Sequence, residues 1–225
     1  MAHTGHATRG NRLLILVAVV LAAAGLAELN QANGSSGPPR PASSVLGKLP
    51  PPAKTVAIAL PTLAFSVPTH IDIPAVDVHA DVMTVDLSAD GSIGTPPLQN
   101  AKLAAWYDRS PAPGQAGSAI LDAHVDSALM SDYRGAFFYL GLAKPGMEID
   151  VTRADHSVAV FAIDEVQAAL KKDFPASEVY AATPYAALRL ITCGGAYDAK
   201  THEYLGNTIV YAHMTAERTP SLRAR

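Results

Sequence analysis

The sequence predicts an all-β domain that follows an apolar segment and a linker. Sixteen glycines and seventeen prolines are spread along the 225 residues, which favours short strands joined by turns over long helices. From about residue 56 onward, apolar and polar residues alternate in short runs, as they do in half-buried strands. The chain is 49% hydrophobic and 16% charged, so it has the apolar content to bury a core of its own.

Residues 1–32 have the character of a targeting segment. Arg9 and Arg12 precede an apolar stretch over residues 13–27. As a helix this stretch would measure about 22 Å at roughly 1.5 Å per residue, less than the roughly 30 Å of a bilayer's hydrocarbon core. The length favours a cleaved signal peptide, and a retained membrane anchor is the alternative. In both cases the positive charges stay inside and the rest of the chain lies outside the membrane.

Residues 33–55 form a linker rich in proline, glycine and serine. Such a composition stays extended and cannot bury a core, so it would hold a folded domain away from a surface. The folded domain is expected over residues 56–214, and residues 215–225 read as a polar tail.

The expected strands follow from alternation and from turn residues between them. A short helix is expected over residues 137–142, and the glycines at 194 and 195 are expected in a loop between the last two strands. The pattern suits a sandwich or a barrel. The expected strands cover residues 71–73, 76–82, 118–121, 147–152, 158–166, 188–193 and 208–213.

The formal net charge of −3 gives no reason to expect a nucleic-acid partner, because phosphate binding requires a basic surface. A single cysteine, Cys193, ends the apolar run 188–193, and it has no second cysteine with which to form an intramolecular disulfide. It therefore either packs or reacts.

A reactive cysteine needs a neighbour that takes its proton, because the thiolate is the nucleophile. His124 is the best of the eight histidines for this role, since it follows an apolar strand, as Cys193 does, and lies in a polar cluster. The pattern alone leaves open a buried, inert cysteine. It also leaves open a metal-dependent hydrolase, because Asp122, His124 and Asp126 alternate along one strand face. No second group of ligands is evident, so we expect no metal and no cofactor.

Several segments resemble the sortases, which are cysteine transpeptidases of the cell surface. Residues 190–193 (Leu-Ile-Thr-Cys) resemble the thiol motif of the family, and residues 123–127 (Ala-His-Val-Asp-Ser) resemble its histidine motif. Residues 106–107 and 113–117 are similar to the segment before that histidine. Residues 194–198 and 207–212 resemble the actinobacterial class F branch. The similarity covers residues 71–213 in the order found in the family.

The resemblance implies an eight-stranded sortase barrel and acyl transfer. Cys193 would attack a C-terminal sorting signal similar to Leu-Pro-X-Thr-Gly and form a thioacyl enzyme, and His124 would act as proton donor and acceptor. The implied partners are secreted proteins that bear the signal and an amine acceptor, such as a cell-wall precursor. The implied location is outside the cytoplasm, either anchored in the membrane by the N-terminal segment or secreted.

The chain departs from the family at the catalytic arginine, which sortases place on the strand after the thiol loop. No arginine stands between Cys193 and Arg218. Two residues are candidates for the third catalytic or substrate-binding role. Asn207 offers an amide donor without the charge, and Arg189 shares a strand face with the thiol because strand side chains alternate. The missing arginine also favours an alternative, a sortase-like barrel with weak or no catalysis that serves as a surface binding protein.

Overall fold

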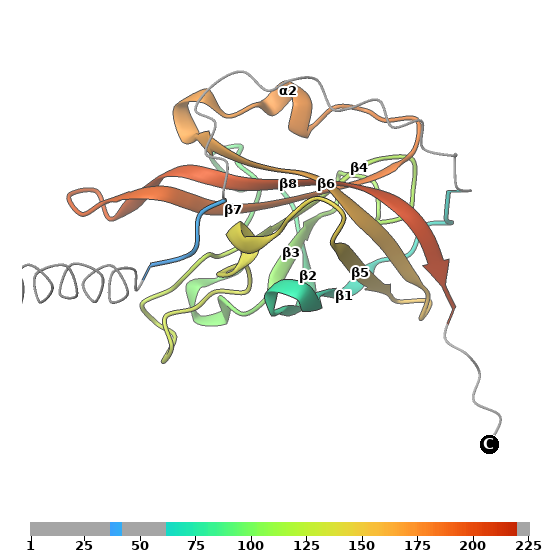
Figure 1. Ribbon diagram of the computed structural model, residues 1–225, viewed down its shortest axis with the longest axis horizontal. Coiled ribbons are helices and arrows are strands. Elements are labelled where there is room, and N and C mark those ends of the chain that lie inside the picture. Colours follow the sequence, from blue (N-terminus) through green and yellow to red (C-terminus); the bar gives the residue numbers. More distant parts are fainter. Residues whose placement is uncertain (1–36, 42–61, 220–225) are drawn as a thin grey trace, which may run out of the picture. The chain divides into compact units, whose positions relative to one another are not determined.

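The computed structural model describes residues 37–41 and 62–219; the expected targeting segment and most of the linker lie outside this range. Eight strands close into a barrel in the order β1-β2-β3-β4-β7-β8-β6-β5 (Figure 1). The predicted fold class, an all-β eight-stranded barrel with short helices, is confirmed. The strands are β1 (Pro68–Ile73), β2 (Val78–Val85), β3 (Ala104–Tyr107), β4 (Gly117–Ala123), β5 (Glu148–Arg153), β6 (Val158–Leu170), β7 (Ala186–Asp198) and β8 (Glu203–Arg218).

The helices of the described residues are single turns in the connections between strands. Not one of them has the length and apolarity required to cross a membrane. Where the sequence predicts a short helix over residues 137–142, the structure has a single 3₁₀ turn. The helical elements are η1 (Pro74–Val76), η2 (Leu98–Asn100), η3 (Leu140–Leu142), η4 (Lys171–Asp173) and α2 (Ala176–Val179).

Two apolar clusters occupy the two faces of the barrel wall. Leu188 and Leu190 of β7 point into the barrel core, whereas Ile191 belongs to a smaller cluster with Ile120, Ile209 and Val179 of α2. This outer cluster lies between β4, β7, β8 and the β6–β7 connection, which carries α2 (Figure 1). Residues 188–193 read as a continuous apolar run because both faces of this strand are covered.

The last hairpin is longer than the sequence suggests. Gly194 and Gly195, expected in a loop, belong to β7, which continues through a bulge to Asp198. At the far end, β8 extends to Arg218, past the point where the polar tail was expected to begin. These additional residues pair with β6 as far as Arg218 opposite Val158, and the Arg218 guanidinium also binds Glu148 and Asp150 of β5.

Part of the expected linker lies against the barrel. Pro41 is buried, and a Cβ added at Gly141 would lie 2.1 Å from the carbonyl oxygen of Pro39. A glycine is therefore needed at position 141 for this close approach. Residues 38–41 of the expected linker are thus packed on the folded domain, whereas the composition of the linker as a whole predicts an extended spacer.

A second close approach fixes the chain beside His124, and substitution there tests the packing. A Cβ at Gly135 would lie 2.1 Å from the backbone oxygen of His124. We expect Gly135→Ala to lower the free energy of unfolding by about 2 kcal/mol or more in urea denaturation, because the backbone must move apart. Gly91→Ala is the control, since a Cβ there meets nothing within 4 Å and only its positive φ of 84° opposes the change, at about 1 kcal/mol. Equal losses for the two variants would contradict the packing argument.

Candidate active site

The parallel pairing of β4 with β7 brings the two strongest candidate residues together. Asp122 of β4 lies opposite Ile191 of β7, and the Thr192 hydroxyl donates a hydrogen bond of 2.7 Å to the carbonyl oxygen of Ala123. His124 directly follows Ala123, and Cys193 directly follows Thr192. They therefore lie side by side, on the outer face of the barrel wall.

The His124 ring is held by the connection between β2 and β3. Its Nε2 lies 2.6 Å from the carbonyl oxygen of Pro96. Because a carbonyl oxygen only accepts hydrogen bonds, Nε2 carries the proton, and Nδ1 is the acceptor in the neutral ring. The ring is therefore oriented to take a proton at Nδ1. The contact with Pro96, 28 residues away in the sequence, could not be found from the motif itself.

The Cys193 thiol is partly buried, and its pKa is raised above the ordinary range. Burial is the largest cause, and the carboxylates of Asp122, Asp126 and Glu203 act in the same direction. The Lys171 ammonium opposes them. The free thiol is thus protonated near neutral pH, and a reaction at sulfur must include removal of this proton.

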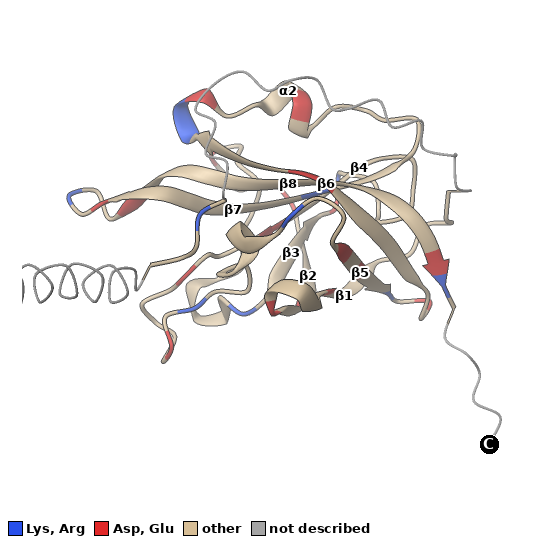
Figure 2. Ribbon diagram, viewed as in Figure 1, with Lys and Arg blue, Asp and Glu red and all other residues tan. Residues whose placement is uncertain are grey.

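Lys171 belongs to η4, at the start of the β6–β7 connection. Its ammonium lies 3.8 Å from a carboxylate oxygen of Glu203, at the start of β8. In Figure 2 the basic band of η4 lies over the hairpin formed by β7 and β8, where acidic residues are also found. The thiol therefore lies among charges of both signs, of which three acidic groups raise its pKa and one basic group lowers it.

Asn207 and Arg189, the two candidates for the missing donor, lie in different places. Asn207 of β8 is paired directly opposite Cys193, and its Nδ2 donates to the carbonyl oxygen of Thr192 at 3.3 Å. Arg189 shares the face of Cys193 but lies four residues back along β7. Its guanidinium stacks 4.8 Å from the ring centroid of Tyr211 and donates to the carbonyl oxygen of Leu188 at 3.0 Å. The structure thus brings Asn207 to the thiol and leaves Arg189 packed farther along the strand.

A tyrosine of β8 secures the chain just beyond the histidine. The Tyr204 hydroxyl donates a hydrogen bond to the carboxylate of Asp126, two residues after His124. Burial and this carboxylate raise the pKa of Tyr204, so the phenol remains the donor. The sequence offered no sign of this contact, which joins residues 78 positions apart.

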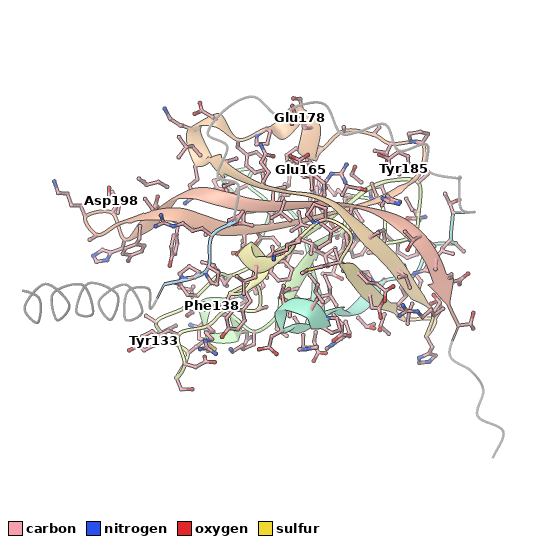
Figure 3. The ribbon with its side chains drawn as sticks, viewed as in Figure 1. Tyr133, Phe138, Glu165, Glu178, Tyr185 and Asp198 are labelled. Atoms are coloured by element: carbon pink, nitrogen blue, oxygen red, sulfur yellow. The ribbon has the colours of Figure 1, made fainter. Side chains whose placement is uncertain are left out.

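The same face carries further carboxyl groups whose pKa values burial raises. Burial raises the pKa of Asp122 to about 7 and also raises that of Glu165 on β6, where the nearby Glu178 of α2 adds to the effect. Figure 3 shows Glu165 and Glu178 on the side of the molecule that α2 covers, whereas Tyr133 and Phe138 lie on the other side of the long hairpin. The site face is thus less solvated than an open strand surface.

A metal centre built on Asp122, His124 and Asp126 is not supported by this arrangement. Within residues 37–41 and 62–219, no group of three His, Cys, Asp or Glu side chains is placed to hold a metal ion. Asp126 is bound by Tyr204, and the His124 ring points one nitrogen at Pro96.

The raised pKa of the thiol gives a direct prediction. Alkylation of Cys193 by iodoacetamide, followed by intact-mass spectrometry, should be slow at pH 7 and should accelerate through the alkaline range, with its midpoint above that of a free cysteine, because the thiolate is the reacting species. Asp126→Asn should move the midpoint downward, since one of the carboxylates that oppose thiolate formation is removed. A thiol that reaches its full rate below pH 7 would contradict the electrostatic description.

Comparisons with known proteins agree with the barrel fold. The family model described as the sortase domain matches residues 71–215. Sortase A from Corynebacterium diphtheriae shares the fold with a TM-score of 0.52 and 20% identity, over 69% of this chain and 63% of that protein. Sortase A from Listeria monocytogenes has a TM-score of 0.52 and 18% identity, over 70% and 93% of the two chains. The SrtA sortase from Actinomyces oris has a TM-score of 0.52 and 17% identity, over 75% and 96%.

No curated protein matches the chain. The matched domain model covers more than half of the sequence and runs from within β1 to the larger part of β8. The solved structures share the closed barrel described above. The chain belongs to the sortase family.

Proposed function

We propose that this protein is a cysteine transpeptidase in which Cys193 is the nucleophile and His124 moves the proton. The observation that supports it most is the β4–β7 register, which puts the imidazole and the only thiol of the chain at adjacent strand positions. Both residues also lie in the segments that resemble the family's histidine and thiol motifs.

In the first half-reaction, Nδ1 of His124 accepts the proton of the thiol, and the sulfur attacks the carbonyl carbon of the threonine in the acyl donor. The bond between that carbon and the departing nitrogen breaks, and His124 returns the proton to the amine that leaves. The product is a thioester on Cys193. The contact of Nε2 with Pro96 keeps the ring in the tautomer that this step requires.

In the second half-reaction, an acceptor amine attacks the thioester carbon. His124 takes a proton from this amine, the new amide bond forms, and Cys193 leaves as the thiolate and regains a proton. Two acyl transfers replace one direct amide exchange, and each has a better leaving group or nucleophile than the uncatalysed reaction.

We assign to Asn207 the stabilisation of the negative charge that develops on the carbonyl oxygen during both steps. It lies opposite Cys193 and already directs its amide nitrogen toward the backbone of Thr192. An amide donor carries no charge, so it stabilises an oxyanion less than the arginine of other sortases would. A slower enzyme than an arginine-containing sortase is the physical consequence.

The acyl donor proposed is a secreted protein with a C-terminal signal similar to Leu-Pro-X-Thr-Gly, and the acceptor is an amine such as that of a cell-wall precursor. The class F resemblance of residues 194–198 and 207–212 supports an actinobacterial branch of the family. The proposed location is outside the cytoplasm, with residues 1–32 as anchor or signal peptide and residues 33–55 as linker.

The test is intact-mass spectrometry of the protein incubated with a Leu-Pro-X-Thr-Gly peptide and triglycine. We expect the wild type to form a thioester on Cys193 and a peptide joined to triglycine, and Cys193→Ala and His124→Ala to form neither. His79→Ala, an exposed histidine of β2, is the matched control and should retain both products. Absence of an adduct on the wild type, with its thiol intact, would favour the inert surface-binding barrel instead.

A pair of substitutions separates the two candidate donors. Asn207→Ala should lower kcat/KM by about 10²-fold, the usual loss for an oxyanion donor, because its amide faces the thiol. Arg189→Met keeps an unbranched side chain over Tyr211 and should change kcat/KM by less than about threefold. The contact that it removes does not involve the reacting atoms, so the transition state loses little stabilisation. The reverse order of effects, measured with the same peptide and acceptor, would move the assignment to Arg189.

A further inference from the structure

Asp122 is a carboxyl group on the site face that the proposed chemistry does not use. It lies on β4 two residues before His124, and it is paired with Ile191, which precedes Cys193 by two residues on β7. Two residues along a strand span about 7 Å. Asp122 therefore lies on the same face as the catalytic pair, two residues earlier along β4.

The surroundings of Asp122 are mainly apolar and supply no cation. Ile120 and Ile191 flank it on the outer face, with Val179 of α2 in the same cluster. The titratable groups near it are His124 just after β4, Cys193 on β7, Tyr107 on β3 and Tyr180 at the end of α2. None of these is a permanent positive charge, and burial alone accounts for the pKa of about 7.

The carboxyl group is nevertheless reachable from outside. Asp122 keeps part of its surface exposed to solvent, and Tyr180 beside it is 48% exposed. Neither a hydrogen bond nor an ion pair is made by the Asp122 side chain within the described residues, and its pKa is raised by desolvation alone. A poorly solvated carboxyl group that is open to solvent on one side is suited to accept a hydrogen bond from a bound molecule.

An unpaired carboxylate at this position also opposes the chemistry at sulfur. The negative charge of Asp122 is one of the causes that raise the pKa of Cys193. A cation bound against Asp122 would cancel this charge and so favour the thiolate. The ligand that best fits the site is therefore one that brings a positive charge beside Asp122 whenever the thiol must react.

On the basis of the proposed acyl-transfer function, we propose that Asp122 is a specificity-determining residue that pairs with a lysine or arginine side chain of the acyl-donor peptide. In this proposal the acyl chain joined to Cys193 runs back over β4 and β7, and an extended chain advances about 3.3 Å per residue. Asp122 is thus within reach of side chains one to three residues before the bond that is cleaved. The sorting signal recognised by this sortase carries a basic residue there.

The test uses two matched pairs of fluorescent peptides. One pair has Leu-Pro-Lys-Thr-Gly and its norleucine equivalent, and the other has lysine or norleucine in place of the leucine of Leu-Pro-Ala-Thr-Gly. Binding to Cys193→Ala is measured by fluorescence anisotropy, so that no acyl transfer is required. At pH 8 we expect at least one lysine peptide to bind about tenfold more tightly than its norleucine match, as expected for a hydrogen bond to a charged group.

The preference should depend on Asp122 and on its charge. Adding Asp122→Asn to Cys193→Ala should reduce the preference to less than about twofold. Adding Glu203→Gln, which removes another carboxylate that acts on the thiol but lies on the exposed start of β8, should leave it in place. Lowering the pH from 8 to 5.5 should also weaken the preference, because Asp122 is protonated below about pH 7 and then carries no charge.

The outcomes separate this proposal from the proposed function. If no lysine peptide binds better than its norleucine match, or if the preference survives in the Asp122→Asn variant, the role of Asp122 is wrong, whether or not the wild type forms a thioester. If the preference follows Asp122 but no thioester forms on the wild type, the recognition site stands and the transpeptidase function fails.

Discussion

The geometry of the candidate site depends on the parallel pairing of β4 with β7. These strands are far apart in the sequence, and their register is fixed by backbone pairing from Gly117–Ala186 to Asp122–Ile191 and by the hydrogen bond from Thr192 to Ala123. A shift of one residue would turn every side chain of one strand to the other face, and the thiol would then point into the core. The barrel closes around this pair of strands, and the β6–β7 connection covers their outer face, so the fold sets both the position and the solvation of the site.

The electrostatics of the site explain why a base is required. Burial and three carboxylates raise the pKa of Cys193, and one lysine acts against them. The thiol is therefore protonated near neutral pH, and in the proposed mechanism the neighbouring His124 imidazole removes its proton. Asn207 occupies the strand position opposite the thiol without bringing a charge. The enzyme proposed here thus relies on proton transfer and on its substrate more than on a fixed cation.

Much of the fold could be predicted from residue patterns, because alternation along β1, β2, β5 and β6 and turn residues between them are local signals. The pairing of His124 with Cys193 was indicated by the family resemblance and by each following an apolar strand, since nothing local reports contact over 69 residues. Alternation put Arg189 on the face of the thiol but could not give the register of β8, which is what favours Asn207. Pro96 and Tyr204 were missed for the same reason, because their contacts join distant segments.

The central claim is that the His124 imidazole and the Cys193 thiol are neighbours that influence each other. Nuclear magnetic resonance of the histidine Cε1–Hε1 groups tests this directly, with the His124 signal assigned from its loss in His124→Gln. We expect conversion of Cys193 to its methylthio disulfide to shift the His124 signal and to leave the signals of His70, His79 and His156 unchanged. A His124 signal at the same position in the free and modified proteins would contradict the account.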